Sequence, residues 1–133
     1  MEEEKNEELE LGLYLIKDVF EEDINESKTK YIINPIRSGN KIMYEGSIVI
    51  IGDVNAGAEI IAGENIVVLG DLRGVAHAGA KGNKKAVIAA GNIEAPQLRI
   101  ANLLWENEGE KENNEKLKTY AHVENNEIIL TSY

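Results

Sequence analysis

Residues 48–72 read IVIIGDVNAGAEIIAGENIVVLGDL, and an aliphatic side chain recurs in them at every sixth position. The same register extends beyond this stretch toward the N-terminus. The residue two positions later in each hexad is mostly apolar or small, and the residue four positions later is rich in glycine and alanine. The aliphatic positions of the register are Ile36, Ile42, Ile48, Val54, Ile60, Ile66 and Leu72.

Each hexad predicts a short strand followed by a tight corner. Residues i and i+2 of a strand lie on one face, so the aliphatic residue and its small partner would both point into the core. Glycine at a corner allows positive φ and close approach of the backbone. A helix would instead repeat apolar residues at i, i+3, i+4 and i+7, and the hexads do not follow that spacing.

A longer repeat predicts the architecture. The segment IVIIGDV (48–54) matches IVVLGDL (66–72) at an offset of 18 residues, and VIAAGNI (87–93) matches the latter at an offset of 21. Three hexads make one turn of a triangular prism. We therefore predict an all-β fold, a triangular β-helix of about four 18-residue coils over residues 36–104, roughly 20 Å long. The three additional residues are expected in or near the loop at 75–83.

Charge divides the 133-residue chain into three parts. Residues 1–30 form an acidic N-terminal segment with a net charge of −7, and residues 31–104, the β-helix domain, carry +1. Residues 105–133, with −4, are expected to form an acidic loop followed by a C-terminal strand or tail. Aromatic residues make up only 5% of the chain, so we expect a single domain with a core of aliphatic and small side chains.

Several classes of function are disfavoured by composition. A net charge of −10 argues against a nucleic-acid partner, which requires a basic surface. The absence of cysteine excludes disulfides, thiol catalysis and cysteine-ligated metals. The chain has no signal peptide and no run of about 18 apolar residues, so we expect a cytoplasmic protein without direct membrane insertion.

No motif for catalysis, metal binding or a cofactor is found. The run GDLRGVAHAG (70–79) has glycines but lacks a P-loop lysine in the right frame. His77 is expected to be an exposed residue of a glycine-rich loop, and Asp53 and Asp71 are expected to cap turns. We therefore expect no catalytic residues, no metal, no cofactor and no enzymatic activity.

Two outer walls of the prism differ in character. The first should be apolar on its outer side and so must be covered, either by a second copy in a twofold dimer, which we favour, or by Leu9–Phe20 folding back as a strand or a helix. The second wall carries Arg37, Asn55, Arg73 and Glu94 beside small residues that would leave the arginines accessible. It is either a docking surface for an acidic partner or a solvated wall with weak ion pairs. The dimer-wall candidates are Val49, Ile51, Val67, Leu69 and Ile88, with Ala90 beside them.

The segments IRSGNKI (36–42), GDVNAGAEIIAGENIVVLGDLRGVAHAGAKGNKKAVIAAGNI (52–93) and QLRIA (97–101) closely resemble the C-terminal domain of the septum-site determining protein MinC. A weaker likeness continues in YAHVENNEIILTSY (120–133). The resemblance implies a right-handed triangular β-helix that forms a homodimer through one wall. It also implies binding to the membrane-associated ATPase MinD, which brings the protein to the inner face of the membrane to oppose assembly of FtsZ.

The resemblance also implies roles for particular residues. The family motif implicated in the MinD contact ends in glutamine, and here it reads Arg37, Ser38, Gly39 and Asn40, with an amide one methylene shorter. Arg73, on the wall shared with Arg37, would be a candidate for an acidic peptide such as an FtsZ tail. Typical MinC proteins have an N-terminal domain that acts on FtsZ, and about thirty residues before the match are too short for such a domain.

Two other functions are compatible with glycine-rich hexads. A structural polymer similar to the bactofilins would stack end to end through exposed sheet edges. An acyltransferase similar to the hexapeptide class would be a trimer with His77 as its base. The hexads match the MinC family better than they match the acyltransferases, and the polymer is the main alternative.

Overall fold

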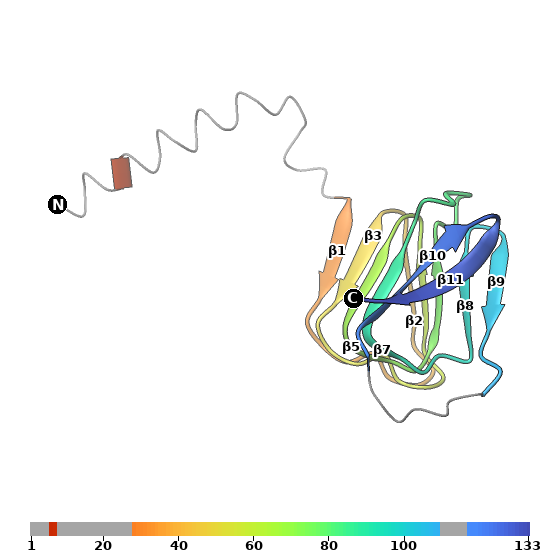
Figure 1. The fold of residues 1–133 in the computed structure, drawn as a ribbon. Helices are drawn as coiled ribbons and strands as arrows, with labels where there is room; N and C mark the ends of the chain where they lie inside the picture. Colours follow the sequence, from red (N-terminus) through yellow and green to blue (C-terminus); the bar gives the residue numbers. More distant parts are fainter. Residues whose placement is uncertain (1–5, 8–27, 110–116) are drawn as a thin grey trace.

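The computed structural model describes residues 6–7, 28–109 and 117–133, and every named element in them is a β-strand. The strands wind into a solenoid with two hairpin-like additions at its C-terminal end (Figure 1). Leu9–Phe20, the alternative cover for the apolar wall, lies outside the described residues. The strands are β1 (Thr29–Ile32), β2 (Lys41–Tyr44), β3 (Ser47–Ile50), β4 (Glu59–Ala62), β5 (Ile66–Leu72), β6 (Val75–Ala78), β7 (Ile88–Ile93), β8 (Gln97–Ile100), β9 (Leu103–Glu106), β10 (Thr119–Glu124) and β11 (Glu127–Ser132).

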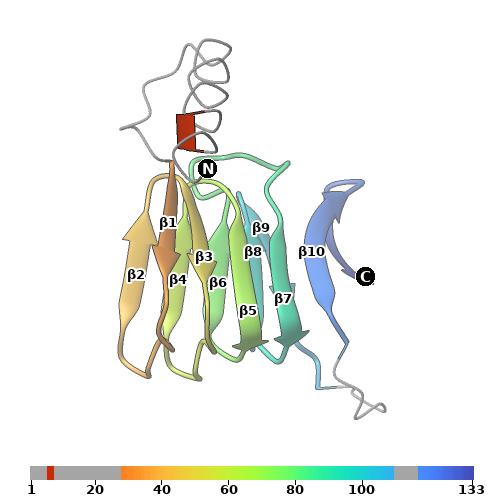
Figure 2. The ribbon, with the colours of Figure 1, turned by 90° about the vertical axis from the view of Figure 1, so that its left-hand side faces the viewer.

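Successive coils stack their strands in parallel to form the walls of the prism. Wall A is the sheet β1-β3-β5-β7-β10-β11, of which β1, β3, β5, β7 and β10 follow one another in Figure 2, and wall B is the sheet β2-β4-β6-β8-β9. Wall C is narrower. It consists of the bridges that join Ile36, Val54 and Leu72, and of the end of β7 beside β5. The predicted β-solenoid of about four coils is confirmed, with the first coil beginning at Thr29.

The core consists of aliphatic rows that run along the prism axis. Ile48, Ile66 and Ile88 pair in register across wall A, and all three are fully buried. Burial of each such side chain stabilises the fold by about 2 kcal/mol. Asn92 is the one buried polar residue in the described part of the chain, and its amide donates a hydrogen bond of 2.8 Å to the Glu94 carboxylate.

The insertion between the third and fourth coils shifts the register. The loop 79–87 joins β6 to β7, and Ile66 pairs with Ile88, one residue further along than the offset of 21 predicts. That offset is recovered at the pair Asp71 and Asn92, after a bulge that follows Val68. The predicted outward position of Ile88 is therefore wrong, because the core row of isoleucines sets the register and the bulge absorbs the additional residue. Ala90 is likewise buried, and Ala89 takes the outward place.

The C-terminal end of the solenoid is covered by antiparallel strands. β9 folds back along β8 in wall B, and β10 pairs with both β7 and β11 in wall A. The turn between β10 and β11 places Asn125 and Asn126 at φ of 51° and 62°, the conformation of a tight hairpin turn. Beyond the last parallel coil, β9 therefore extends wall B by one strand and the β10–β11 hairpin extends wall A by two.

Candidate partner-binding surfaces

The turn at residues 37–40 projects from the corner where wall C meets wall B, and its four residues are all exposed. The Asn40 N–H donates to the Arg37 carbonyl at 3.1 Å, and Gly39 has a φ of +88°. The Gly39 N–H donates to the carbonyl of Gly57 in the next coil at 3.0 Å. The hydrogen bond to the next coil therefore fixes the backbone of the turn, while the side chains of the turn face outward.

Ser38 lies directly over the next coil. A Cβ on Gly57, which also has a φ of +88°, would collide with the Ser38 hydroxyl. Ser38 is exposed rather than directed inward as the hexad pattern suggests, because wall C contributes only a single bridging residue per coil at this point. Arg37 makes no ion pair within the described ranges, so its guanidinium faces solvent.

Arg73 lies on the same wall in a different electrostatic setting. The bridges that join Ile36, Val54 and Leu72 place Arg37, Asn55 and Arg73 in line along wall C. The guanidinium of Arg73 contacts Asp71 at 2.8 Å, Glu94 at 3.1 Å and Asp53 at 3.7 Å. Arg73 is thus partly exposed, with 35% of its side chain accessible, but carboxylates from three coils surround its guanidinium.

The corner aspartate Asp53 also ties neighbouring coils together. Its Oδ1 atom accepts a hydrogen bond of 2.8 Å from the Asp71 N–H in the next coil. Since Asp53 and Asp71 are one coil apart, their carboxylates stack on one side of the prism, and both reach the guanidinium of Arg73. Arg73 therefore links neighbouring coils through its ion pairs, an arrangement called here the Arg73 clamp. Asn55, which lies beside Arg73 on wall C, is half-buried.

Replacing Arg73 with glutamine is expected to lower the free energy of unfolding by about 1–2 kcal/mol, because three carboxylates are left facing one another. Added salt should recover part of this loss by screening their repulsion. The control is Lys41→Gln, which removes the single exposed pair with Glu59 at 4.0 Å and should cost less than about 0.5 kcal/mol. Urea unfolding at low and high salt measures both; equal losses for the two variants would contradict the clamp.

The outer face of wall A is largely apolar across β1, β3 and β5. Tyr31, Val49 and Val67 are aligned in neighbouring strands and point outward. Ile51 and Leu69, beside this row, are 42% and 58% exposed. An apolar face of this extent on a folded domain is typical of a protein interface.

The C-terminal hairpin extends this apolar face. The ring of Tyr120 stacks on His122 with centroids 4.8 Å apart and lies 6.2 Å from the ring of Tyr133. His122 also shares a hydrogen bond of 2.8 Å with the Thr131 hydroxyl. These residues are not among the sites predicted from the sequence, although the alternation of Tyr120 and His122 in the segment YAHVE is a signal that could have indicated them.

The outer face of wall B is mixed. Met43, Ile61, His77 and Arg99 follow one another in register across its strands. His77 belongs to β6, so its predicted place in a loop is wrong, and its Nε2 atom lies 2.8 Å from the carbonyl oxygen of Ala101. This contact occupies one of the two ring nitrogens of His77.

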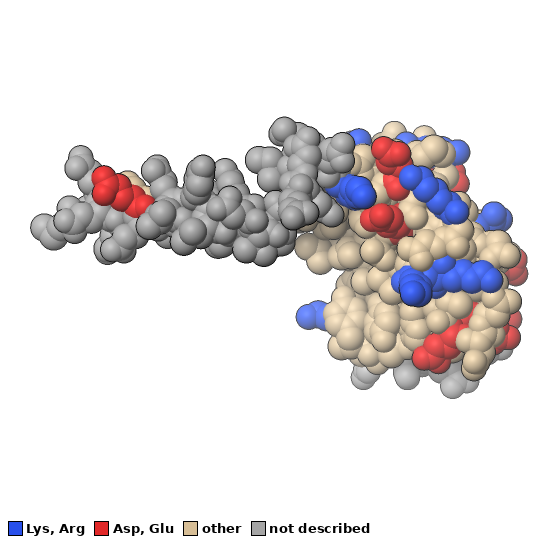
Figure 3. All heavy atoms as spheres, turned by 90° about the horizontal axis from the view of Figure 1, so that it is seen from above, with Lys and Arg blue, Asp and Glu red and all other residues tan. Residues whose placement is uncertain are grey.

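Charges of both signs are interspersed along the edge of the prism that carries the loop 79–87, where wall B leads into wall A. Figure 3 shows this edge from above, with basic and acidic side chains interspersed. Lys81 of the loop pairs with Glu45 at 3.7 Å. In residues 6–7, 28–109 and 117–133, no three histidine, aspartate or glutamate side chains gather as metal ligands would. The same residues contain no helix of the length and apolarity needed to cross a bilayer.

Known proteins are similar to this chain in sequence and in fold. The family model described as "Septum formation inhibitor MinC, C-terminal domain" matches residues 30–133. A probable septum site-determining protein MinC of Thermoanaerobacter sp. (strain X514) is 54% identical over 93 residues, which cover 67% of this chain and 44% of that protein. The corresponding protein of Caldanaerobacter subterraneus subsp. tengcongensis is 44% identical over 119 residues, which cover 86% and 55%.

A solved structure agrees with these relatives. The "MinC:MinD cell division protein complex" of Aquifex aeolicus contains a chain that is 37% identical, with a TM-score of 0.74. The match covers 80% of this chain and 87% of that one. The chain spans about half the length of the curated relatives it matches. From the family match, the identities and the shared solenoid, this chain belongs to the family of the C-terminal domain of the septum formation inhibitor MinC.

Proposed function

We propose that this chain is a cell-division regulator of the MinC type. In this proposal its β-solenoid forms a homodimer through the outer face of wall A and binds the ATPase MinD through the turn at residues 37–40. The observation that carries the proposal is Arg37, an exposed arginine without an ion pair in the described residues, held on a turn whose backbone is fixed by the next coil. The solved relative from Aquifex aeolicus is part of a complex with MinD, which supports the choice of partner.

MinD would also determine where the protein acts. The chain would be cytoplasmic and reach the inner face of the membrane through the ATPase, where it would oppose FtsZ ring assembly. This is a binding function in which the solenoid supplies surfaces rather than catalytic groups. The contact of His77 with the Ala101 carbonyl gives no support to an acyltransferase base. The antiparallel strands over the C-terminal end disfavour a polymer that stacks parallel edges end to end.

The proposed MinD contact predicts a specific loss of affinity. Arg37→Ala should weaken binding to MinD in the presence of ATP by at least about ten-fold, because the bidentate donor of the turn is removed. The circular dichroism spectrum and the melting temperature should stay unchanged, since Arg37 is exposed. Binding of the purified chain to MinD from the same organism, with ATP and with ADP, is the measurement.

The matched control is Lys85→Ala, which removes an exposed cation from the loop 79–87 at the other end of the wall B strands. It should leave MinD affinity within about two-fold of the unmodified chain. Retained affinity in Arg37→Ala, or an equal loss in both variants, would refute the assignment of the turn.

A further inference from the structure

An open groove lies at the C-terminal end of the solenoid, away from both the outer face of wall A and the turn at residues 37–40. It has a volume of about 640 Å³ and includes atoms from β7, β9 and β11. The groove exists because, in the described residues, wall C ends before the other two walls. β9 extends wall B and the β10–β11 hairpin extends wall A, whereas the described residues add no strand to wall C beyond β7. The lining residues are Ile93, Leu104, Trp105, Glu106, Asn107, Glu108 and Leu130.

The floor of the groove is a part of the hydrophobic core that the described residues leave open. Trp105 pairs with Leu98 across wall B, and Leu130 pairs with Ala121 across wall A, so both lie on the core side of their sheets. Leu98 and Ala121 are fully buried, whereas Trp105 and Leu130 are only half-buried. The end of the core thus presents an indole and an aliphatic side chain to the groove.

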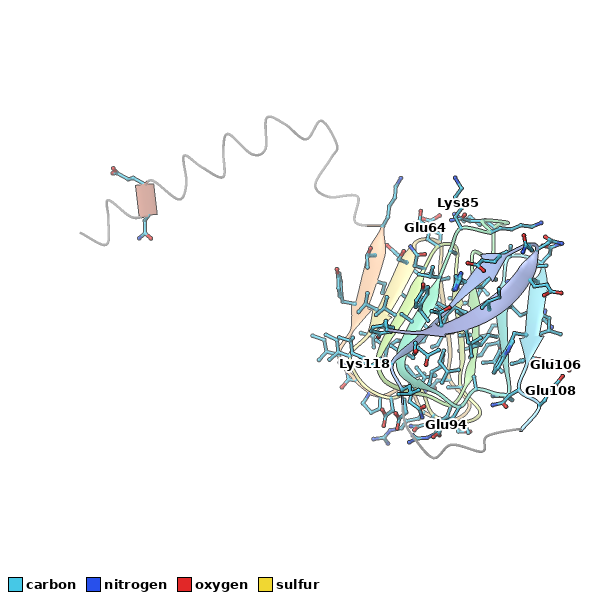
Figure 4. The ribbon with its side chains drawn as sticks, viewed as in Figure 1. Glu64, Lys85, Glu94, Glu106, Glu108 and Lys118 are labelled. Atoms are coloured by element: carbon cyan, nitrogen blue, oxygen red, sulfur yellow. The ribbon has the colours of Figure 1, made fainter. Side chains whose placement is uncertain are left out.

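The rim of the groove is acidic and held in place. Glu106 and Glu108 lie at the end of β9 in Figure 4, are exposed, and form no ion pair within the parts of the chain that the structure describes. Between them, Asn107 donates from its backbone N–H to the Pro96 carbonyl at 2.9 Å and from its amide to the Ala95 carbonyl at 3.2 Å. The Gly109 N–H donates to the Asn107 side chain at 3.0 Å. The rim is therefore preformed, which lowers the cost of binding.

Two segments of the chain itself could be considered as occupants of this groove, and neither is suited to it. The adjoining residues 110–116, EKENNEK, have no apolar side chain to occupy the floor. The apolar run Leu9–Phe20 belongs to residues 1–30, which carry 11 acidic and 4 basic residues and would be repelled by an acidic rim. The apolar floor and the anionic rim together favour a positively charged ligand with an apolar side chain as its anchor.

We infer that this groove binds a segment of a partner protein in which a bulky apolar side chain is flanked by lysine or arginine residues. The apolar side chain would pack on Trp105 and Leu130, and the flanking cations would contact Glu106 and Glu108. The inference goes beyond the proposed function, because it uses neither the outer face of wall A nor the turn at residues 37–40.

The single tryptophan of the chain provides a direct readout. The full chain is titrated with the model peptide KKLLKK, blocked at both ends, while the fluorescence of Trp105 is recorded. A saturable change in emission is expected with KKLLKK, and none with EELLEE or KKGGKK, which lack the charge or the anchor. Absence of a saturable response to KKLLKK, or an equal response to KKGGKK, would overturn the inference.

Charge variants distinguish binding of the peptide in the groove from its non-specific electrostatic attraction to an acidic chain. The double variant Glu106→Gln with Glu108→Gln should weaken binding of KKLLKK roughly ten-fold. The control Glu124→Gln with Glu127→Gln makes the same charge change at exposed positions beside the β10–β11 turn and should leave the affinity unchanged. Equal weakening by both double variants would mean non-specific attraction and would refute the site.

Discussion

Leu69→Asp is expected to convert the proposed dimer into monomers. Leu69 is 58% exposed at the centre of the outer face of wall A, beside Val67 and Ile51. A carboxylate there would be buried without a partner in each half of a twofold interface, and the cost of such a charge is several kcal/mol. The dimer dissociation constant should therefore rise at least about 100-fold. Sedimentation equilibrium of the full chain measures the change.

The control variant is Met43→Asp on the outer face of wall B, where Met43 is 63% exposed. It introduces the same charge at a similar exposure on a different wall and should leave the dimer intact. Monomers in Met43→Asp and dimers in Leu69→Asp would move the interface from wall A to wall B. A monomeric unmodified chain at all concentrations would reject the dimer itself.

Gly63→Ala is expected to lower the stability of the fold by about 3 kcal/mol, a large effect for the addition of a single methyl group. Gly63 is buried at the corner between β4 and β5, and its N–H donates to the Tyr44 carbonyl at 2.9 Å. A Cβ at this position would collide with the backbone carbonyl of Glu45 in the preceding coil. Because coils stack at a fixed spacing, the chain can accommodate the methyl group only by separating them. The melting temperature should fall by about 12 °C.

Gly82→Ala provides the contrast for that measurement. Gly82 has a φ of +109°, and nothing lies within 4 Å of a Cβ built on it, so the substitution costs only backbone strain of about 1 kcal/mol. Gly63 has no positive φ of this kind, so the loss of stability in Gly63→Ala would report the contact between coils alone. A melting temperature for Gly63→Ala equal to or above that of Gly82→Ala would show that the corner does not limit the spacing of the coils.

The parts of the fold that depend on periodicity could be predicted from the chain. Ile48, Val54 and Ile60 recur every six residues because each must reach the same axis from a different wall, and all three are fully buried. The apolar outer face of wall A followed from the same spacing, since Val49 and Val67 alternate with the core residues. The position of Arg37 and Arg73 on one wall also followed.

Predictions failed where the repeat is interrupted or where coils interact. Whether Ile88 points inward or outward depends on where the bulge between β5 and β7 absorbs the insertion. Core packing sets the position of that bulge, so counting residues along the sequence does not reveal it. The three carboxylates around Arg73 come from different coils, so only stacking brings them together. The aromatic residues of the hairpin lie outside the repeat altogether, and nothing in the hexads indicated that β10 would pair with β7.

The sequence by itself determined the prism, the number of its coils and the contrast between an apolar wall and a charged one, because these depend on the local alternation of side chains along each strand. Only the tertiary structure decided which charged groups are neutralised, which turn presents an exposed arginine, and where the described strands leave the core open. These properties depend on contacts between residues one or more coils apart. Such contacts depend on the register of stacking, which insertions, bulges and the end of wall C set in three dimensions.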